Sequence, residues 1–292
     1  MNNEKLRKQY LFGNVRIDVI LPKEMLIPEN VTLFEVQGEP AKKVCELSFA
    51  EDLDQIVDTF SKENPNLKCL QRNSMDILSV QGKECRVLKL EDVNFVYAVC
   101  IEENGERVNT WVSSGAANLL QLETIFVSLL APEKLLIGEG EIILHSAYML
   151  KDGKAVLFSA PSGTGKSTQA ELWEAYRGTR QVNGDRSLLV KEADGWYACG
   201  WPICGSSGIC SNEAYPIQAI VMLQQARENK IKRLGIAAAV RKIVSQVTIN
   251  MWNAEFQMQA IDLIQDLVME IPVLELECDI SEEAVSCLEG VL

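Results

Sequence analysis

The stretch FSAPSGTGKSTQAELW, residues 158–173, indicates how the second half of the chain folds. Its core, APSGTGKS at residues 160–167, has the spacing of a phosphate-binding loop, with Ala160 where the first glycine usually stands. The apolar run KAVLFSA leads into it, and KSTQAELWEAY follows with Ala170, Trp173 and Tyr176 at helical spacing. A strand, a glycine-rich turn and a helix in this order are the context that confirms such a motif. We therefore predict a nucleotide-binding loop here.

The chemistry of the loop explains its residue types. A polyphosphate needs several backbone N–H donors that converge on one spot, and small residues let the chain wrap that closely. Lys166 is placed to reach the β- and γ-phosphates, and Ser167 to offer a hydroxyl to Mg²⁺. The alternative is an ordinary glycine-rich turn. The predicted cofactor-binding residues are Ser162, Gly163, Thr164, Gly165, Lys166, Ser167 and Thr168.

A phosphoryl-transfer site also needs a carboxylate for the metal, usually at the end of a strand. The candidate is Asp185 in QVNGDRSLLV, because one apolar stretch ends at Val182 and another begins at Leu188. The other interpretation of Asn183-Gly184-Asp185 is a plain turn.

Composition limits the partners. The net charge is −13 and no cluster of Lys and Arg is present, which argues against a nucleic-acid partner. No apolar run reaches the ~18 residues of a spanning helix, and the polar start MNNEKLRKQY argues against a secretory signal. Nine scattered cysteines without a CxxC pair indicate reduced thiols. These features predict a cytoplasmic protein that binds neither nucleic acid nor a membrane.

The chain has two predicted parts. Residues 1–132 are predicted to be mostly β, with strands in VRIDVILP, VTLFEV and KVCELSF. A helix is predicted in EDLDQIVDTFSKEN. A meander is predicted from residue 75 to 113, with a turn at Asn104-Gly105. A helix through ANLLQLETIFVSLLAP is expected to stop at Pro132, the predicted domain boundary. Residues 133–292 mix strands and helices without strict alternation. The predicted fold class is therefore α/β or α+β.

Several stretches of the second half resemble a known family. LHSAYMLKDGKAVLFSAPSGTGKSTQAELW followed by VNGDRSLL resembles the catalytic domain of HPr kinase/phosphorylase and its relatives. His145 lies 21 positions before Lys166, which is the family's separation between a histidine and the loop lysine. GWPICG, IQAIVMLQQARENKIKRL and IPVLELECDISEEAV are similar to a looser HPr-kinase-like group that carries a β-rich N-terminal part. The resemblance covers residues ~140 to 290, about half the chain.

The resemblance implies a fold and an activity. The fold would be an HPr kinase C-terminal domain, like the nucleotide-binding half of phosphoenolpyruvate carboxykinase, preceded by a β-rich domain. The activity would be transfer of the γ-phosphoryl of ATP to a hydroxyl on a peptide, a protein serine or a small metabolite. His145, Lys166 and Asp185 would be the catalytic residues, and Ser167 and Asp185 would hold Mg²⁺.

One departure from the family leaves two outcomes open. The first Asp of the family's Asp-Asp-Arg motif, thought to deprotonate the acceptor, is Gly184 here. Either Asp185 or neutral His145 accepts the proton instead, or the chain binds ATP as a silent regulatory or peptide-binding module. Carboxykinase activity is disfavoured, since it needs a second cation site built from His, Lys and Asp, and Arg for the substrate carboxylates, which a chain with one histidine does not easily supply. The oligomeric state stays open.

Two regions have open roles. The loop from Gly200 to Asn212 either grips an acceptor or is a surface connection. The N-terminal half either adds a peptide as an edge strand or serves only as a packing partner.

Overall fold

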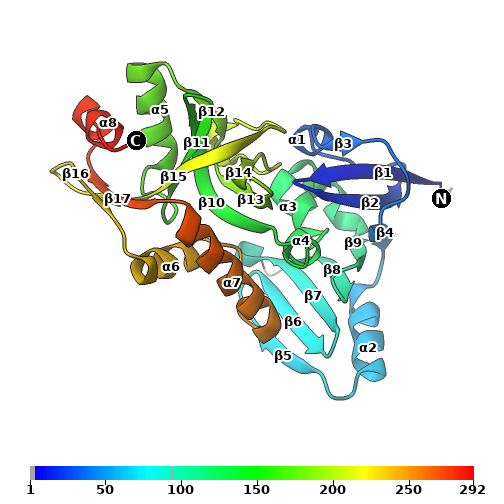
Figure 1. Cartoon of the computed structure of the whole chain (residues 1–292). Coiled ribbons are helices and arrows are strands. Elements are labelled where there is room, and N and C mark those ends of the chain that lie inside the picture. The colour runs from blue at the N-terminus through cyan, green and yellow to red at the C-terminus, as the bar shows by residue number, and fades with distance from the viewer. Residues whose placement is uncertain (1–3, 94) are drawn as a thin grey trace. The chain divides into compact units, whose positions relative to one another are not determined.

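The computed structural model describes residues 4–93 and 95–292, and the chain divides into two compact units, Met1–Leu136 and Ile137–Leu292 (Figure 1). Each unit contains its own β-sheet together with helices. The fold is therefore a mixed α/β one of the α+β kind, as predicted at this level. The predicted boundary near residue 132 lies at the start of α4. None of the helices in the described ranges has the length and apolarity to span a membrane.

The first unit is built on a nine-stranded sheet in the order β3-β1-β2-β4-β9-β8-β7-β6-β5. Its strands are β1 (Lys5–Phe12), β2 (Val15–Pro22), β3 (Glu35–Val36), β4 (Lys43–Ala50), β5 (Lys68–Gln71), β6 (Met75–Val80), β7 (Lys83–Leu90), β8 (Phe95–Glu103) and β9 (Arg107–Ser113). Its helices are α1 (Glu29–Thr32), α2 (Leu53–Glu63), α3 (Glu123–Ser128), α4 (Pro132–Ile137) and the 3₁₀ segments η1 (Glu91–Val93) and η2 (Ser114–Gln121).

Much of the predicted β pattern is confirmed. Strand β2 buries the alternating Val15, Ile17, Val19 and Leu21, as a period of two requires. The meander β6-β7-β8-β9 is antiparallel throughout. Asn104-Gly105 closes its last hairpin with both residues at positive φ, 53° and 69°, the geometry that favours this dipeptide.

Two expectations for the first unit were wrong. The stretch at residues 31–36 is only a strand at Glu35–Val36, because α1 occupies its beginning. The single helix expected over residues 117–132 is broken at Leu122, whose extended backbone separates η2 from α3. Pro132 begins α4 instead of ending a helix, because the missing N–H of proline costs nothing in the first turn.

The second unit contains an eight-stranded sheet whose path β11-β10-β13-β14-β15 closes on itself, because β15 also pairs with β11. Strand β10 makes this closure possible, since its first half pairs with β13 and its second half with β11. The strands are β10 (Ile142–Lys151), β11 (Lys154–Ser159), β12 (Arg180–Asn183), β13 (Arg186–Glu192), β14 (Gly195–Cys199), β15 (Ala214–Gln225), β16 (Lys230–Arg233) and β17 (Val273–Cys278). The helices are α5 (Lys166–Arg177), the 3₁₀ segment η3 (Gly205–Ser207), α6 (Ile236–Val244), α7 (Ala254–Glu270) and α8 (Glu282–Glu289).

Strand β11 is buried on both faces, which explains its continuous apolar run. Ala155 and Leu157 join one apolar cluster, to which α6 and α7 contribute. Val156 and Phe158 join a second cluster, with α5 and α8. Helices thus cover both faces of β11, and the strand carries the loop at its C-terminal end to the start of α5 (Figure 1).

Helix α5 is held in place mainly by Trp173, which is fully buried in the second cluster. Ala170, one turn earlier, is buried beside it. Tyr176, the third residue of the predicted stripe, is 45% exposed and belongs to neither cluster. Arg177 closes the last turn with ion pairs to Glu282 and Glu289 of α8.

We expect Trp173→Ala to lower the free energy of unfolding by about 3–5 kcal/mol, because it leaves a cavity under the helix that follows the loop. Denaturant unfolding followed by circular dichroism measures this. Tyr176→Ala on the same helix is the control and should change the value by less than about 1 kcal/mol. Equal effects of the two substitutions would contradict the assignment of Trp173 as the anchor of α5.

Candidate nucleotide-binding site

The glycine-rich segment lies between β11 and α5, as the sequence predicted. Gly163 and Gly165 have φ of 76° and 109°, a backbone region that other residues rarely adopt. Gly165 is the N-cap of α5 and no side chain caps the first turn. The first N–H groups of an α-helix have no partner within the helix, and they carry its partial positive charge. This end of α5 therefore suits an anion.

Lys166 is buried, with only 7% of its surface exposed. Its Nζ donates a hydrogen bond to the carbonyl oxygen of Ala160 at 3.2 Å, so the side chain folds back over the loop. Within residues 4–93 and 95–292 it has no carboxylate at ion-pair distance. Burial lowers the pKa of the Lys166 amine, while the negative charge of Asp185 opposes that shift. A buried ammonium group without an ion-pair partner suits an anionic ligand.

His145 on β10 and Asp185 in the turn before β13 form a pair within the second unit. Strand pairing aligns His145 on β10 with Arg186 on β13, and Asp185 directly precedes Arg186. The Nε2 of His145 lies 3.2 Å from Oδ1 of Asp185, and the Nε of Arg186 lies 3.6 Å from Oδ2. Both His145 and Asp185 are partly buried, with side chains 20% and 26% exposed.

The charge of Asp185 follows from its neighbours. Burial raises the pKa of its carboxyl, but the hydrogen bond from His145 and the positive charges of Arg186 and Lys166 outweigh burial and hold the pKa below its usual value. Asp185 is therefore ionised at neutral pH. It is both a carboxylate for a cation and an acceptor for its histidine partner.

The main chain fixes this pair relative to the loop. The hydroxyl of Ser159, the last residue of β11, donates to the carbonyl oxygen of His145 at 2.8 Å. The amide of Ser146 donates to the carbonyl oxygen of Asp185 at 2.9 Å. Because the loop begins directly after Ser159, the first bond ties the loop to the strand that carries His145, and the second ties that strand to the turn that carries Asp185.

The loop residues predicted from sequence form one continuous segment. Ser162 and Gly163 are exposed, whereas Thr164, Gly165, Ser167 and Thr168 are partly buried. A hollow of about 350 Å³ lies beside the loop, lined by residues 161–164 and 223–225. That volume is at the small end of ligand sites. In the described part of the chain Ser167 and Asp185 do not hydrogen-bond to each other.

Gln225 is a residue of this site that the sequence analysis missed. Its Nε2 donates to the carbonyl oxygens of Gly163 and Thr164, at 3.3 and 3.4 Å. Nothing in the sequence indicated this contact, because it depends on the parallel pairing of β15 with β11. Arg186 was part of the quoted motif, but its bond to Thr248 Oγ1 at 3.1 Å depends on tertiary structure.

The loop from Gly200 to Asn212 packs onto the turn that carries Asp185. The amide of Gly184 donates to the carbonyl oxygen of Ile209 at 3.2 Å, and Asn183 Nδ2 donates to that of Ile203 at 3.2 Å. Gly205, at φ 60°, lies so close to Asp185 that a Cβ there would be 2.9 Å from the Cβ of Asp185. The segment from Gly200 to Asn212 is therefore in direct contact with the turn that carries Asp185.

Gly184 is the position where the family resemblance expects an aspartate. A Cβ at Gly184 would overlap the Oγ of Ser207 and would lie 2.7 Å from the carbonyl oxygen of Cys204. Ser207 is itself fixed, since its hydroxyl donates to the carbonyl oxygen of Cys204 at 2.9 Å and accepts from the amide of Ile209 at 3.2 Å. The loop occupies the space that a side chain at position 184 would need.

Comparison with known proteins gives a family. Residues 117–292 match the family model described as "SynChlorMet cassette protein ScmC". The chain belongs to this family. The matched segment comprises the helical end of the first unit and the whole of the second, including the loop, His145 and Asp185.

Other comparisons add less. A search of curated proteins finds no match. A solved structure, "Structure of the Hpr(Ser) kinase/phosphatase from Coxiella burnetii", is similar over 51% of this chain and 94% of that chain, with 11% sequence identity and a TM-score of 0.31. A likeness at this TM-score does not establish a shared fold.

We expect Gly184→Ala to lower the free energy of unfolding by about 1–3 kcal/mol, because its methyl group would displace Ser207 and Cys204. Gly138→Ala is the control, since a Cβ there meets nothing within 4 Å. The control should change stability by less than about 1 kcal/mol. Thermal and denaturant unfolding measure both. If the Gly184→Ala protein is as stable as the parent, the loop from Gly200 to Asn212 does not pack directly against Gly184.

Proposed function

We propose that the chain is an ATP-binding phosphotransferase, similar to HPr kinase, that moves the γ-phosphoryl group to a hydroxyl. The acceptor would be a serine of a peptide or protein, or a small metabolite. One observation carries the proposal. A glycine-rich turn at the start of α5, which no side chain caps, holds the buried ammonium of Lys166, and the described part of the chain places no carboxylate at ion-pair distance from it. The sequence motifs shared with the HPr kinase family support the choice of ATP and of phosphoryl transfer.

Mg²⁺ fits the residues at hand. The carboxylate of Asp185 and the hydroxyl of Ser167 are oxygen ligands, and Mg²⁺ usually takes one or two carboxylates and completes its shell with water and phosphate oxygens. Among the described residues no three His, Cys, Asp or Glu side chains group around one point. Asp185 would thus act as a lone carboxylate ligand. When bound, the metal ion would neutralise charge on the phosphates.

The side chains and backbone amides of the protein would stabilise charge on the transferred group and accept the proton of the acceptor. Lys166 and the loop amides would stabilise negative charge on the transferred group. His145, through its contact with Asp185, would orient that carboxylate. As the acceptor oxygen bonds to the γ-phosphorus and ADP leaves, either Asp185 or His145 would accept the proton of the acceptor hydroxyl. Phosphoryl transfer depends more on positioning and charge stabilisation than on a strong base. The absence of a carboxylate at Gly184 is therefore compatible with transfer.

A second candidate is a catalytically silent module that binds ATP to regulate a partner or to present a peptide. The closed space at Gly184 favours it, because Ser207 and Cys204 leave no room for the family's base. The two candidates share the nucleotide and differ in whether phosphate leaves it.

We expect Lys166→Ala to weaken ATP binding by about tenfold to a hundredfold, the loss for hydrogen bonds to a charged group. Isothermal titration calorimetry of the whole chain with ATP and Mg²⁺ measures it. Lys154→Ala, an exposed lysine of the same strand–loop region, is the control and should leave the affinity unchanged. If the parent chain gives no binding signal with ATP and Mg²⁺, the proposal fails.

Transfer is tested separately from binding. ATP with a labelled γ-phosphate, incubated with the chain and a panel of serine peptides and metabolites, should give a labelled acceptor. Asp185→Asn removes the charge that the metal needs and should lower the transfer rate by at least about a hundredfold. Asp194→Asn, an exposed aspartate in the β13–β14 turn, is the matched control. Tight ATP binding with no label on any acceptor would favour the silent module.

A further inference from the structure

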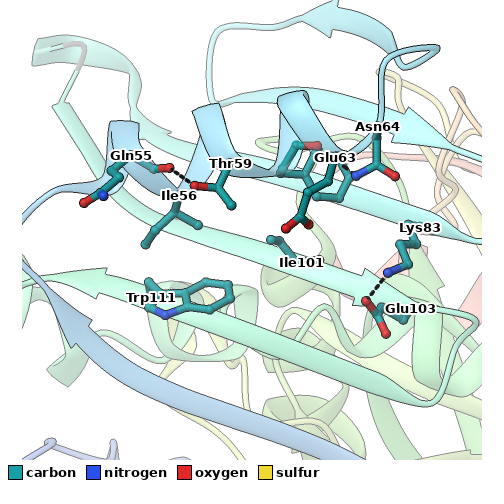
Figure 2. A pocket seen from close by; sticks show the side chains of 10 residues that line it. Gln55, Ile56, Thr59, Glu63, Asn64, Lys83, Ile101, Glu103 and Trp111 are labelled. Atoms are coloured by element: carbon teal, nitrogen blue, oxygen red, sulfur yellow. Dashed lines mark hydrogen bonds and ion pairs between the residues drawn. The ribbon is translucent and has the colours of Figure 1, made fainter.

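A second hollow lies wholly within the first unit, between α2 and strands β7, β8 and β9 (Figure 2). Its volume is about 340 Å³. Helix α2 forms its roof, and the three strands form its floor. The residues that line it are Gln55, Ile56, Thr59, Phe60, Glu63, Asn64, Lys83, Ile101, Glu103 and Trp111.

The hollow exists because α2 covers the sheet incompletely. The helix buries only Leu53 and Phe60, whereas Ile56 stays partly exposed on the side of the hollow. On the floor Ile101 and Trp111 are also partly exposed. Three other tryptophans of the chain, in contrast, are at most 1% exposed. An aromatic ring and two isoleucines thus provide apolar surface that the unit does not cover itself.

Charge accumulates at one end of the hollow. Lys83 on β7 pairs with Glu103 on β8, with Nζ and Oε1 2.8 Å apart. Glu63 points from the end of α2 toward the strand that carries Ile101 (Figure 2). It is exposed, and its negative charge adds to that of Glu103 in raising the pKa of Lys83. Two carboxylates against one ammonium leave this end net negative.

The helix that covers the hollow, Leu53–Glu63, carries three carboxylates and one lysine. Glu63 is the carboxylate of this helix that lines the hollow, whereas Asp54 and Asp58 lie outside it. An apolar floor beside an acidic rim complements a ligand that has an apolar group next to a positive charge. The volume of the hollow is at the small end of ligand sites, and one bulky side chain that anchors a longer partner can fill it.

We propose that this hollow binds an extended peptide segment through one bulky apolar side chain flanked by lysine or arginine. The apolar side chain would lie on Trp111 and Ile101, and the flanking cation would pair with Glu63. This inference goes beyond the proposed function and does not depend on it. All of its residues belong to the first unit, and none belongs to the nucleotide loop.

The test uses the full chain without nucleotide and the peptide fluorescein-Gly-Lys-Phe-Lys-Gly-amide, followed by fluorescence anisotropy. Binding should be saturable. Replacing Phe by Ser, or both Lys by Glu, should weaken it by about tenfold or more, because each change removes one of the two complementary features. Glu63→Lys should weaken binding of the parent peptide by about fivefold or more.

Asp58→Lys is the matched control. It makes the same charge change at an exposed site on α2 outside the hollow, so binding should change by less than about twofold. The proposal is overturned if the peptide does not bind, if the serine or glutamate peptide binds equally well, or if the two variants weaken binding equally. Displacement by free phenethylamine at the peptide's own affinity would assign the hollow to small amines and also overturn it. Because nucleotide is absent, none of these results bears on ATP binding.

Discussion

The candidate site of the second unit depends on the buried positive charge of Lys166, which has no carboxylate at ion-pair distance among the residues that the structure describes. Water would solvate the Lys166 amine better than the carbonyl oxygen of Ala160 does, so holding it inside the loop costs free energy. Left-handed glycines at positions 163 and 165 impose the turn that holds it there. An anion bound at this point would interact with the Lys166 amine, with the backbone N–H groups of the first turn of α5 and with the positive end of the helix dipole. Strand β11 behind the loop is buried on both faces, and this packing keeps these donors in place.

The second constraint is close approach of the backbone around Asp185. Glycines at 184 and 205 let the segment after β14 contact the turn directly, so that a side chain at position 184 is excluded by packing. The glycine at position 184 is therefore coupled to the conformation of a loop some twenty residues further along the chain, since Ser207 occupies the space that a side chain would need. Asp185 of the turn contacts His145 of β10.

Local sequence predicted those parts of the fold that depend on local periodicity and turn chemistry. The strands of the meander, α2, the strand before the glycine-rich loop and α5 followed from alternation, helical spacing and an Asn-Gly turn. Strand β1 was missed because its charged start hides the alternation that buries Tyr10 and Phe12. The break at Leu122 was missed because every residue around it is compatible with a helix. In the candidate site, the glycine-rich loop could be predicted from the spacing of its residues. The contact of Gln225 with the loop and the packing of Ser207 against Gly184 could not, because both depend on segments that are distant in the sequence.

Strands β10 and β13 run antiparallel and carry the paired residues His145 and Arg186, and their hairpin turns, Asp152-Gly153 and Ala193-Asp194, lie in opposite directions from that pair. About six residues of extended chain, roughly 20 Å, separate each turn from the charged cluster. Lengthening such a turn leaves strand pairing intact, so an insertion at either position is expected to leave the charged cluster in place. The same positions would accept a fluorophore or an epitope tag, and a probe there would report on the whole unit without blocking access to the loop.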